Sequence, residues 1–444
     1  MRFWIGARGS DMKGEARGIA AATAGDADSP LASGSLALVG DAVAAPSPTW
    51  LAAHPRHEVV YAALEKQGRV GAFRRTGEAT LTPLGETVAT GDATCHVSVA
   101  PDGSHLIAAS WGEGIVTHIA LAADGRLGTG VQGDPSEDPY ASGAKPAPDA
   151  AALVAEDGGI ADLRSLIDRG ADASQLAAML AGSTPSPAIG ADAGLDEIMA
   201  ILGQSQNPYD DPAVRDILRG SAPAESQNPL AGAIDLSGKA PEAPAERVPR
   251  AHCSVFLPGG LVATTDLGYD LVRFWRTGPR GIRLDHEVAL PIGTGPRHLS
   301  LHPSGHLHVV TEFSCEVYVL RAGPDGRWVL RSGIAASRGA LPGDTAAELT
   351  RSRDGEFLYA GLRGSDTIAV LRVRGEGDRL EPVALAESGI RTPRHHVVIR
   401  DALLVAGQGS HEIASLALDQ RTGIPGRVRH RLSTPSPQHI LPVR

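Results

Sequence analysis

The chain has 444 residues, of which 42% are hydrophobic and 4% aromatic, and its formal net charge is −10. This length exceeds one ordinary domain, and the apolar fraction excludes a wholly disordered chain because Val, Leu, Ile and Ala suffice to pack sheets. No run approaches 18 apolar residues and no Lys/Arg-rich tract is interleaved with aromatics, so we expect neither a membrane nor a nucleic-acid partner.

The first 45 residues contain short apolar runs that predict strands at 2–7, 18–23 and 35–39. They precede the first complete repeat of the chain, and a strand-like tail, 437–443, follows the last repeat. We predict that the two ends share one sheet, because a ring closed by strands from both termini has no free edge strand.

A strand-turn-strand phrase recurs through the rest of the chain. In its clearest copy, residues 296–320, an alternating apolar run to Leu301 is followed by a turn, a second run to Thr311, another turn and a third strand. Six copies are present, at residues 50–73, 95–119, 251–275, 296–320, 346–373 and 394–418.

The six copies share one internal spacing. The residue that opens the second turn is followed five positions later by a β-branched residue, in the pairs Glu65/Val70, Trp111/Val116, Leu267/Val272, Glu312/Val317, Arg363/Ile368 and Gln408/Ile413. A period in the forties with strands inside each unit is the signature of a propeller. We therefore predict an all-β fold, a seven-bladed β-propeller closed by N- and C-terminal strands, with an inserted helical or partly disordered segment.

The insertion, residues 133–248, has a different composition. Ala, Asp, Pro and Gly dominate it. It has 19 Asp/Glu and 7 Lys/Arg, so most of the negative charge lies in the insertion and the rest of the chain has a net charge of about +2. Runs that stop at glycine predict short helices at 160–168, 172–181, 195–202 and 212–219. A small helical cap and a mobile linker both fit this pattern. The predicted organisation is propeller at 1–132, acidic insertion at 133–248, and propeller again at 249–444.

Cys95, Cys253 and Cys315 are the three cysteines of the chain. An odd number within or beside strand repeats argues against a disulfide framework and for a reducing compartment. Because the N-terminus also has no apolar signal core, we expect a cytoplasmic protein.

The repeat also predicts where polar side chains meet. In a propeller the start of each first strand and the end of each second strand lie on one face, at the mouth of the central channel. The residues predicted there are His96, His252, Arg297, His298, Arg394 and His395 from first strands, and Glu65, Trp111, Glu312, Arg363 and Gln408 from second strands.

These residue types suit an anionic substrate. Arg297, Arg363 and Arg394 can hold a carboxylate or phosphate by paired hydrogen bonds, or they can tie blade to blade. The mouth histidines are equally well explained as packed, hydrogen-bonded side chains. Glu312 is the first candidate for a general base, because a carboxylate among arginines stays ionised. Glu65 is the second candidate and Glu348 the third.

We expect no metal and no cofactor. His306 with His308, and His54 with His57, lie close in the sequence, but no Cys or carboxylate completes a site beside them. The chain also has no nucleophile-elbow, phosphate-loop or dinucleotide-binding motif.

Several phrases resemble the lactonase family of seven-bladed propellers, which includes the propeller type of 6-phosphogluconolactonase and the fungal carboxy-cis,cis-muconate cyclases. They are CHVSVAPDG at 95–103, PRAHC at 249–253, GPRHLSLHPSG at 295–305, AAEL at 346–349 and TPRH at 392–395. The resemblance implies a metal-free site with functional residues at His252, Arg297, Glu312 and Arg363. Here Thr311 and Leu362 stand where family members often have Asn.

Three functions follow as hypotheses. The first is hydrolysis of a sugar lactone, with 6-phosphogluconolactone as a candidate, by water activated by Glu312 or a neighbouring histidine. The second keeps the site for a cyclase, isomerase or lyase acting on a conjugated carboxylate or a secondary metabolite. The third is a non-catalytic scaffold that binds a protein partner through the acidic insertion.

Overall fold

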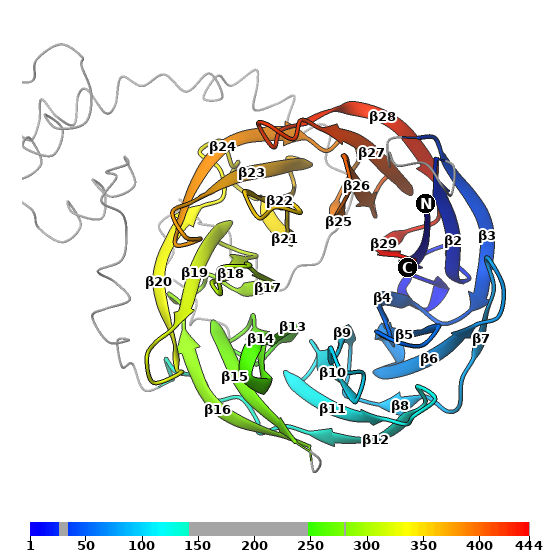
Figure 1. Ribbon diagram of the computed structural model, residues 1–444, viewed down its shortest axis with the longest axis horizontal. Helices are drawn as coiled ribbons and strands as arrows, with labels where there is room; N and C mark the ends of the chain where they lie inside the picture. Colours follow the sequence, from blue (N-terminus) through cyan, green and yellow to red (C-terminus); the bar gives the residue numbers. More distant parts are fainter. Residues whose placement is uncertain (26–33, 142–246, 279–280, 444) are drawn as a thin grey trace, which may run out of the picture. The chain divides into compact units, whose positions relative to one another are not determined.

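A computed structural model describes residues 1–25, 34–141, 247–278 and 281–443, and these form seven antiparallel sheets arranged in a ring (Figure 1). Each sheet is one blade, with its first strand nearest the ring centre and its last strand outside. The predicted seven-bladed propeller is therefore confirmed. The helices predicted between residues 160 and 219 lie outside the described residues.

The first three blades follow in chain order. Blade 1 contains β4 (Pro48–Ala53), β5 (Val59–Leu64), β6 (Arg69–Arg75) and β7 (Leu81–Pro83), and β8 (Val88–Ala89) also pairs with β6. Blade 2 contains β9 (Thr94–Val99), β10 (His105–Ser110), β11 (Ile115–Leu121) and β12 (Leu127–Gln132). Blade 3 contains β13 (Ala251–Leu257), β14 (Leu261–Asp266), β15 (Leu271–Gly278) and β16 (Gly281–Ala289).

The next three blades come from the last third of the chain. Blade 4 contains β17 (Pro296–Leu301), β18 (Leu307–Thr311), β19 (Glu316–Ala322) and β20 (Trp328–Ala335). Blade 5 contains β21 (Thr345–Arg351), β22 (Phe357–Arg363), β23 (Thr367–Arg374) and β24 (Arg379–Glu387). Blade 6 contains β25 (Pro393–Ile399), β26 (Ala402–Gly407), β27 (Glu412–Leu418) and β28 (Pro425–Ser433).

Blade 7 closes the ring with both ends of the chain, as predicted. Its strand order is β29 (Pro437–Pro442), β1 (Arg2–Ala7), β2 (Gly18–Ala24) and β3 (Leu36–Ala44). β29 and β1 are antiparallel, with Ile5 opposite Ile440, and the two termini lie close together in Figure 1. This pairing closes the ring, so no incomplete blade is left at either end of the chain.

The core consists of one apolar cluster at each junction between neighbouring blades. At the junction of blades 3 and 4, for example, Phe274 packs with Val309, Leu320 and Trp328. Strands inside the ring are covered on both faces, and every residue of β5 is buried. The blades therefore stabilise one another, because no blade can bury both faces alone.

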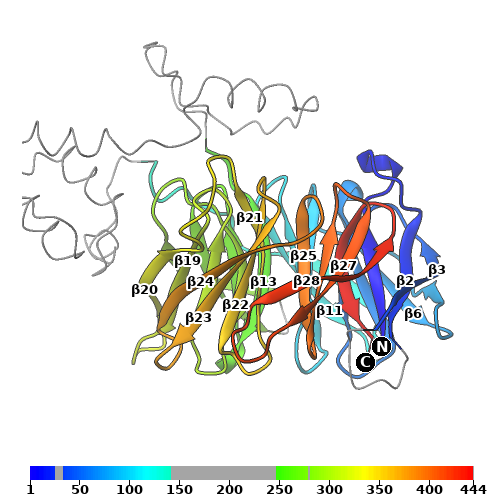
Figure 2. The same ribbon diagram turned by 90° about the horizontal axis from the view of Figure 1, so that it is seen from above.

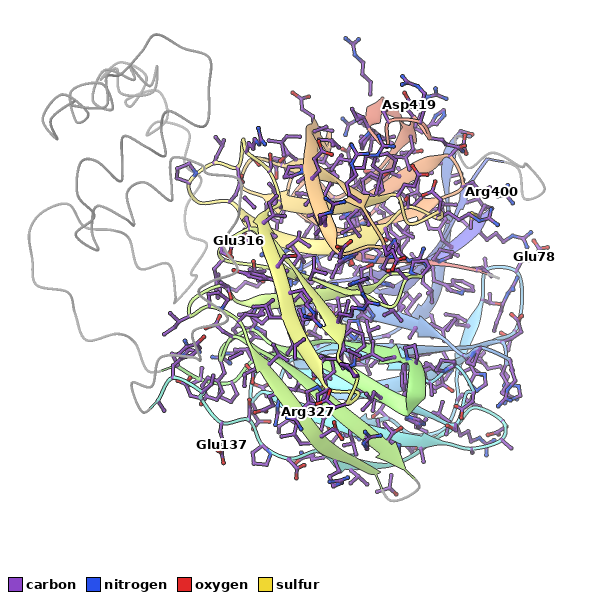
Figure 3. All side chains as sticks on the ribbon, turned by 60° about the vertical axis from the view of Figure 1, so that its left-hand side comes forward. Glu78, Glu137, Glu316, Arg327, Arg400 and Asp419 are labelled. Atoms are coloured by element: carbon purple, nitrogen blue, oxygen red, sulfur yellow. The ribbon has the colours of Figure 1, made fainter. Side chains whose placement is uncertain are left out.

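The fourth strand of each blade was missing from the predicted phrase of three strands. These outer strands are covered on one face only; in β24 intermediate and exposed residues alternate along the strand. Charged side chains such as Arg327 and Asp419 project from the outside and from the turns (Figure 3). Such polar strands lack the apolar signal on which the prediction depended.

Short 3-10 turns occur at Ser10–Met12, Glu65–Gln67 and Pro258–Gly260. Among the described residues, no helix is long and apolar enough to cross a membrane. Seen from the side, the strands run between two opposite faces of the propeller (Figure 2). We call the face where first strands begin and second strands end the mouth, and the opposite face the far end.

Candidate active site

Each innermost strand has a β-bulge next to the mouth. In blade 4, Pro296 lies opposite Thr311 and His298 opposite Val310, so Arg297 is the extra residue. The other six blades have the same register shift at the same place. Bulges re-aim side chains and are common next to active sites.

Because the bulge recurs at the same place in every blade, equivalent residues of the seven blades can be grouped into three rings around the channel. The mouth ring lies at the ends of the second strands and consists of Arg8, Glu65, Trp111, Leu267, Glu312, Arg363 and Gln408. The bulge ring consists of Thr49, Cys95, His252, Arg297, Ala347, Arg394 and Gln438. The floor ring, one residue further along each first strand, consists of Trp50, His96, Cys253, His298, Glu348, His395 and His439.

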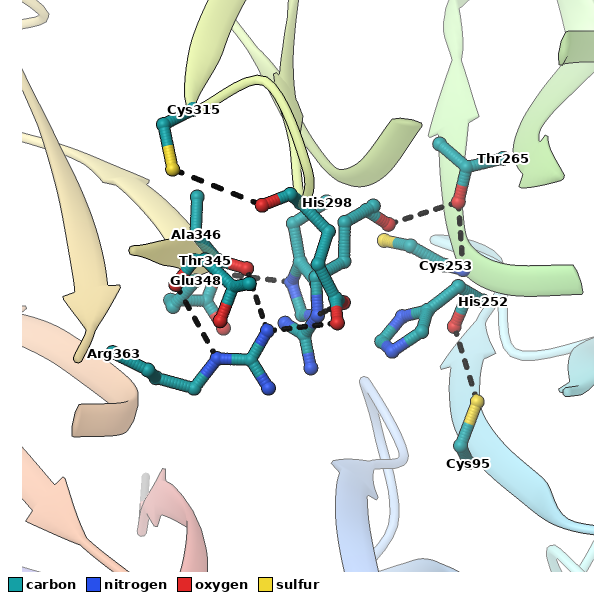
Figure 4. A network of polar contacts seen from close by, with 12 residues as sticks. Cys95, His252, Cys253, Thr265, His298, Cys315, Thr345, Ala346, Glu348 and Arg363 are labelled. Atoms are coloured by element: carbon teal, nitrogen blue, oxygen red, sulfur yellow. Dashed lines mark hydrogen bonds and ion pairs between the residues drawn. The ribbon is translucent and has the colours of Figure 1, made fainter. Parts of the chain in front are cut away.

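Glu312 joins two arginines of neighbouring blades. Its Oε2 accepts from Nε of Arg297 at 2.7 Å, and its Oε1 lies 2.9 Å from Nη2 of Arg363. Arg363 also donates to the backbone carbonyls of Thr345 and Ala346, as seen in Figure 4. Burial alone would raise the pKa of Glu312, but the adjacent guanidinium groups lower it to about 2. Glu312 is therefore ionised and bound through both oxygens.

The arginines of the bulge ring retain unused donors. Arg297 is 2% exposed, and its buried Nη1 has no hydrogen-bond partner. Arg394 has no ion pair or side-chain hydrogen bond with the described part of the chain. Burial lowers the pKa of Arg394 well below its ordinary value, and three nearby arginines lower it further. Such unsatisfied cations are expected where an anion binds.

His252 lies beside this cationic group. Its ring centroid is 5.2 Å from that of His298 (Figure 4), and its buried Nδ1 has no hydrogen-bond partner among the described residues. Burial lowers the pKa of His252 well below 6.5, and the positive charge of Arg297 acts in the same direction. His252 is therefore neutral at pH 7 and able to accept a proton.

Aromatic rings close the channel below the bulge ring. The indole of Trp50 contacts four histidine rings of the floor ring, with centroid distances of 4.0 to 5.3 Å, to His96, His298, His395 and His439. Burial lowers the pKa of each of these histidines well below 6.5. Glu348 lies between two of them, with Oε1 3.2 Å from Nδ1 of His298 and Oε2 3.5 Å from Nε2 of His395.

The three cysteines are free thiols, as the odd number predicted. Burial raises the pKa of Cys253 to about 12 and that of Cys315 to about 11, and it raises the pKa of Cys95 further. Cys95 donates weakly to the backbone oxygen of His252 at 3.6 Å. All three thiols are protonated at neutral pH, so none is a thiolate nucleophile.

A small pocket lies between the rings, with a volume of about 20 Å³. Its walls are Thr49, Trp50, Glu65, Cys95, His252, Arg297, His298, Arg394 and Gln438. This volume admits roughly one water molecule or one small polar group. Among the described residues, no cluster of three or more His, Cys, Asp or Glu side chains could hold a metal ion.

The model of the family described as "Lactonase, 7-bladed beta-propeller" matches residues 4–159 and 220–442. The chain belongs to this family.

Relatives of this lactonase-family chain include uncharacterized proteins of Staphylococcus aureus strains, 33% identical over 181 residues, which is 39% of this chain and 53% of theirs. The chain spans about half the length of these curated relatives. Among solved structures, a periplasmic gluconolactonase of Pseudomonas aeruginosa has a TM-score of 0.67 at 19% identity, covering 99% of this chain and 98% of that chain.

Two further structures share the fold. A Lactobacillus plantarum protein has a TM-score of 0.67 at 18% identity, with 99% of this chain and 98% of that chain covered. A Bacteroides uniformis protein provisionally named 6-phosphogluconolactonase has a TM-score of 0.63 at 20% identity, with the same coverage.

Most of the predicted site residues of this lactonase-family chain meet in the three rings. Those that hold ring positions but do not line the pocket are His96, Trp111, Glu312, Arg363, His395 and Gln408. The indole of Trp111 stacks on Arg250, whose guanidinium carbon is 4.0 Å from its centroid. The prediction missed Arg8, Gln438 and His439, which come from blade 7. The sequence Pro437-Gln438-His439 repeats the spacing of Pro296-Arg297-His298, and this signal could have found two of them.

Proposed function

We propose that the chain hydrolyses a sugar lactone at the mouth, with 6-phosphogluconolactone as the first candidate substrate. The observation that carries this proposal is that one small pocket is lined by both a neutral histidine, His252, and an arginine, Arg297, with an unused hydrogen-bond donor. A base next to fixed cationic donors is what hydrolysis of an ester carbonyl requires. The family membership and the gluconolactonase neighbour support the same chemistry.

The reaction begins with a water molecule that attacks the carbonyl carbon of the lactone. His252 accepts a proton from this water as the new C–O bond forms. The electron pair of the carbonyl moves to its oxygen, and the guanidinium groups of Arg297 and Arg394 stabilise the resulting oxyanion. When the tetrahedral intermediate collapses, the ring oxygen leaves and takes the proton back from His252. The product is the open-chain hydroxy acid.

The pocket volume of about 20 Å³ sets how the substrate lies. A sugar ring does not fit into this space, so only the reacting carbonyl or the attacking water enters it. The rest of the substrate then lies on the mouth ring, where the remaining charged side chains can contact its substituents.

Glu312, our first candidate for the base, is assigned a positioning role instead. A carboxylate with a pKa of about 2 and both oxygens bound to arginines is a weak proton acceptor. Its negative charge holds Arg297 and Arg363 together at the mouth despite their mutual repulsion. Glu312 thus fixes the direction in which the free nitrogens of Arg297 point.

The direct test is an assay of the purified protein on 6-phosphogluconolactone and on gluconolactone, each compared with its spontaneous hydrolysis. We expect acceleration that saturates with substrate and disappears in the His252→Asn variant. If neither lactone is hydrolysed faster than in buffer, lactone hydrolysis is the wrong assignment. Turnover that survives His252→Asn would retain the function and reject the assigned base.

A further inference from the structure

Arg8 occupies the mouth-ring position of blade 7. Its backbone N–H donates to the carbonyl of Ser436 at 3.1 Å, as that of Glu312 donates to Gly295 at 2.7 Å. The repeat spacing did not reveal it because the loop after β1 is long, so β2 begins only at Gly18. The structure therefore adds an arginine to the mouth that the sequence pattern had missed.

Arg8 and Arg394 lie at the mouth end of two neighbouring blades, 7 and 6. The charge of Arg8 is one of the causes that lower the pKa of Arg394. Within residues 1–25, 34–141, 247–278 and 281–443, no carboxylate forms an ion pair with either arginine. The buried Nε of Arg8 also has no hydrogen-bond partner. Glu65 acts on Arg394 electrostatically but is not within ion-pair distance.

The mouth is thus divided into two unequal parts. Glu312 forms ion pairs with the arginines of blades 4 and 5, whereas no carboxylate of the described residues pairs with the arginines of blades 6 and 7. Two like charges on adjacent blades disfavour the empty site, and a bound dianion would relieve that repulsion. A phosphate monoester carries roughly −1.5 to −2 charges at pH 7 and three acceptor oxygens, so it suits two guanidinium groups.

We propose that Arg8 and Arg394 together form a phosphate subsite beside the reacting centre. In this subsite Arg8 is the specificity-determining residue. This assignment rests on the proposed lactone hydrolysis. Arg394 belongs to both the pocket and the subsite. Arg8 contacts only the substituent of the substrate that lies on the mouth ring. The subsite therefore sets the preference for a phosphorylated lactone over its unphosphorylated counterpart without taking part in bond breaking.

The test compares Arg8→Gln with Arg17→Gln, a matched control that removes the same charge from an exposed position in the same loop. For 6-phosphogluconolactone we expect Arg8→Gln to lower kcat/KM about tenfold or more, mainly through KM, for a lost charge-assisted contact. Turnover of unphosphorylated gluconolactone stays within about twofold. Arg17→Gln leaves both substrates unchanged. Equal losses on both lactones, or no loss on either, would overturn the subsite.

A second measurement separates the subsite from the catalytic proposal. Inorganic phosphate should raise the Tm of the wild-type protein and of Arg17→Gln, and this increase should disappear in Arg8→Gln. Without phosphate, Arg8→Gln should unfold at the same Tm as the wild type or slightly higher, because it removes a repulsion. Loss of the phosphate effect in a protein that hydrolyses neither lactone supports the subsite and rejects the hydrolase. A phosphate effect that persists in Arg8→Gln rejects the subsite whatever the activity.

Discussion

His54 and His302 at the far end differ from His252 at the mouth in their hydrogen bonds. At the far end, Nε2 of His54 lies 3.3 Å from the carbonyl of Gly103, and Nε2 of His302 lies 3.0 Å from that of Gly355. Each ring thereby connects two neighbouring blades. At the mouth, His252 has no such partner. Because a buried polar group without a partner lowers stability, its presence at the mouth indicates a role in binding or catalysis rather than in folding.

Blade 5 shows what the far-end histidines contribute. Ser352 stands in blade 5 where blades 1 and 4 have His54 and His302. Its hydroxyl oxygen accepts from the N–H of Phe357 at 3.0 Å and does not reach blade 6. A cavity of about 710 Å³ remains between blades 5 and 6. The far-end histidine therefore fills space and joins blades, and its effects should appear in stability alone.

The largest expected effect is that of His252→Asn. We expect kcat/KM on a lactone substrate to fall about 10³-fold, since a general base contributes roughly 10²- to 10⁴-fold. The free energy of unfolding should hardly change, because the ring has no partner to lose. Steady-state kinetics combined with urea denaturation measures both quantities.

His302→Asn is the matched control at the far end. It should lower the free energy of unfolding by about 1 to 3 kcal/mol, because it leaves the carbonyl of Gly355 without its partner. The rate per folded molecule should stay at the wild-type level. A loss of activity in His302→Asn alone, or of stability in His252→Asn alone, would reverse the distinction between the two ends.

Glu312→Gln should have the next largest effect. The amide keeps the shape of the side chain but removes the charge that holds Arg297 and Arg363, so we expect kcat/KM to fall about 10²-fold with the fold retained. Circular dichroism checks the fold, and the rate is counted per folded molecule. If the only change were a lower Tm, Glu312 would tie blades together and have no part in catalysis.

The pH profile should report the low pKa of His252. Burial and the charge of Arg297 both disfavour the protonated ring, so His252 remains a base as the pH falls through 6.5. We expect kcat/KM to be constant from pH 8 to pH 6.5, where an ordinary histidine would already have lost half of its activity. Glu312, with a pKa of about 2, adds no change in this range. An acid limb with its midpoint at or above pH 6.5 would contradict the assignment.

The sequence allowed the fold and most of the mouth to be predicted, because the spacing from Glu312 to Val317 recurs in six blades and places equivalent residues on one face. The outer strands were missed since they bury only one face. Arg8 was missed because a long loop breaks the spacing in blade 7. The pairing of Glu312 with Arg297 and Arg363 could not be predicted, since it depends on how far side chains reach between blades. That pairing is what separates a positioning carboxylate from a base.

The mouth also contains an arginine, Arg247, that is paired with two carboxylates. Arg247 forms ion pairs with Asp138 at 3.1 Å and with Asp270 at 2.9 Å, and its guanidinium carbon lies 5.1 Å from the ring centroid of Tyr140. The hydroxyl of Tyr140 donates to the carbonyl of Leu290. These contacts hold the chain on both sides of the insertion against blade 3. Because these contacts, which we call the clasp, join the two segments that flank the insertion, they should be structural although they lie at the mouth.

The smallest effect is therefore expected when residues 142–246 are replaced by a short Gly-Ser linker. The clasp keeps both ends of the cut in place, so Tm and lactone turnover should match the full chain, with a change in unfolding free energy within about 1 kcal/mol. Adding Arg247→Gln to the shortened chain should lower Tm, since it removes both ion pairs.

We propose the acidic insertion as the docking segment for a protein partner. A partner that co-purifies with the full chain but not with the shortened chain would support this. A shortened chain that unfolds at a much lower Tm would instead make the insertion part of the propeller's own stability, because the clasp alone would then be insufficient.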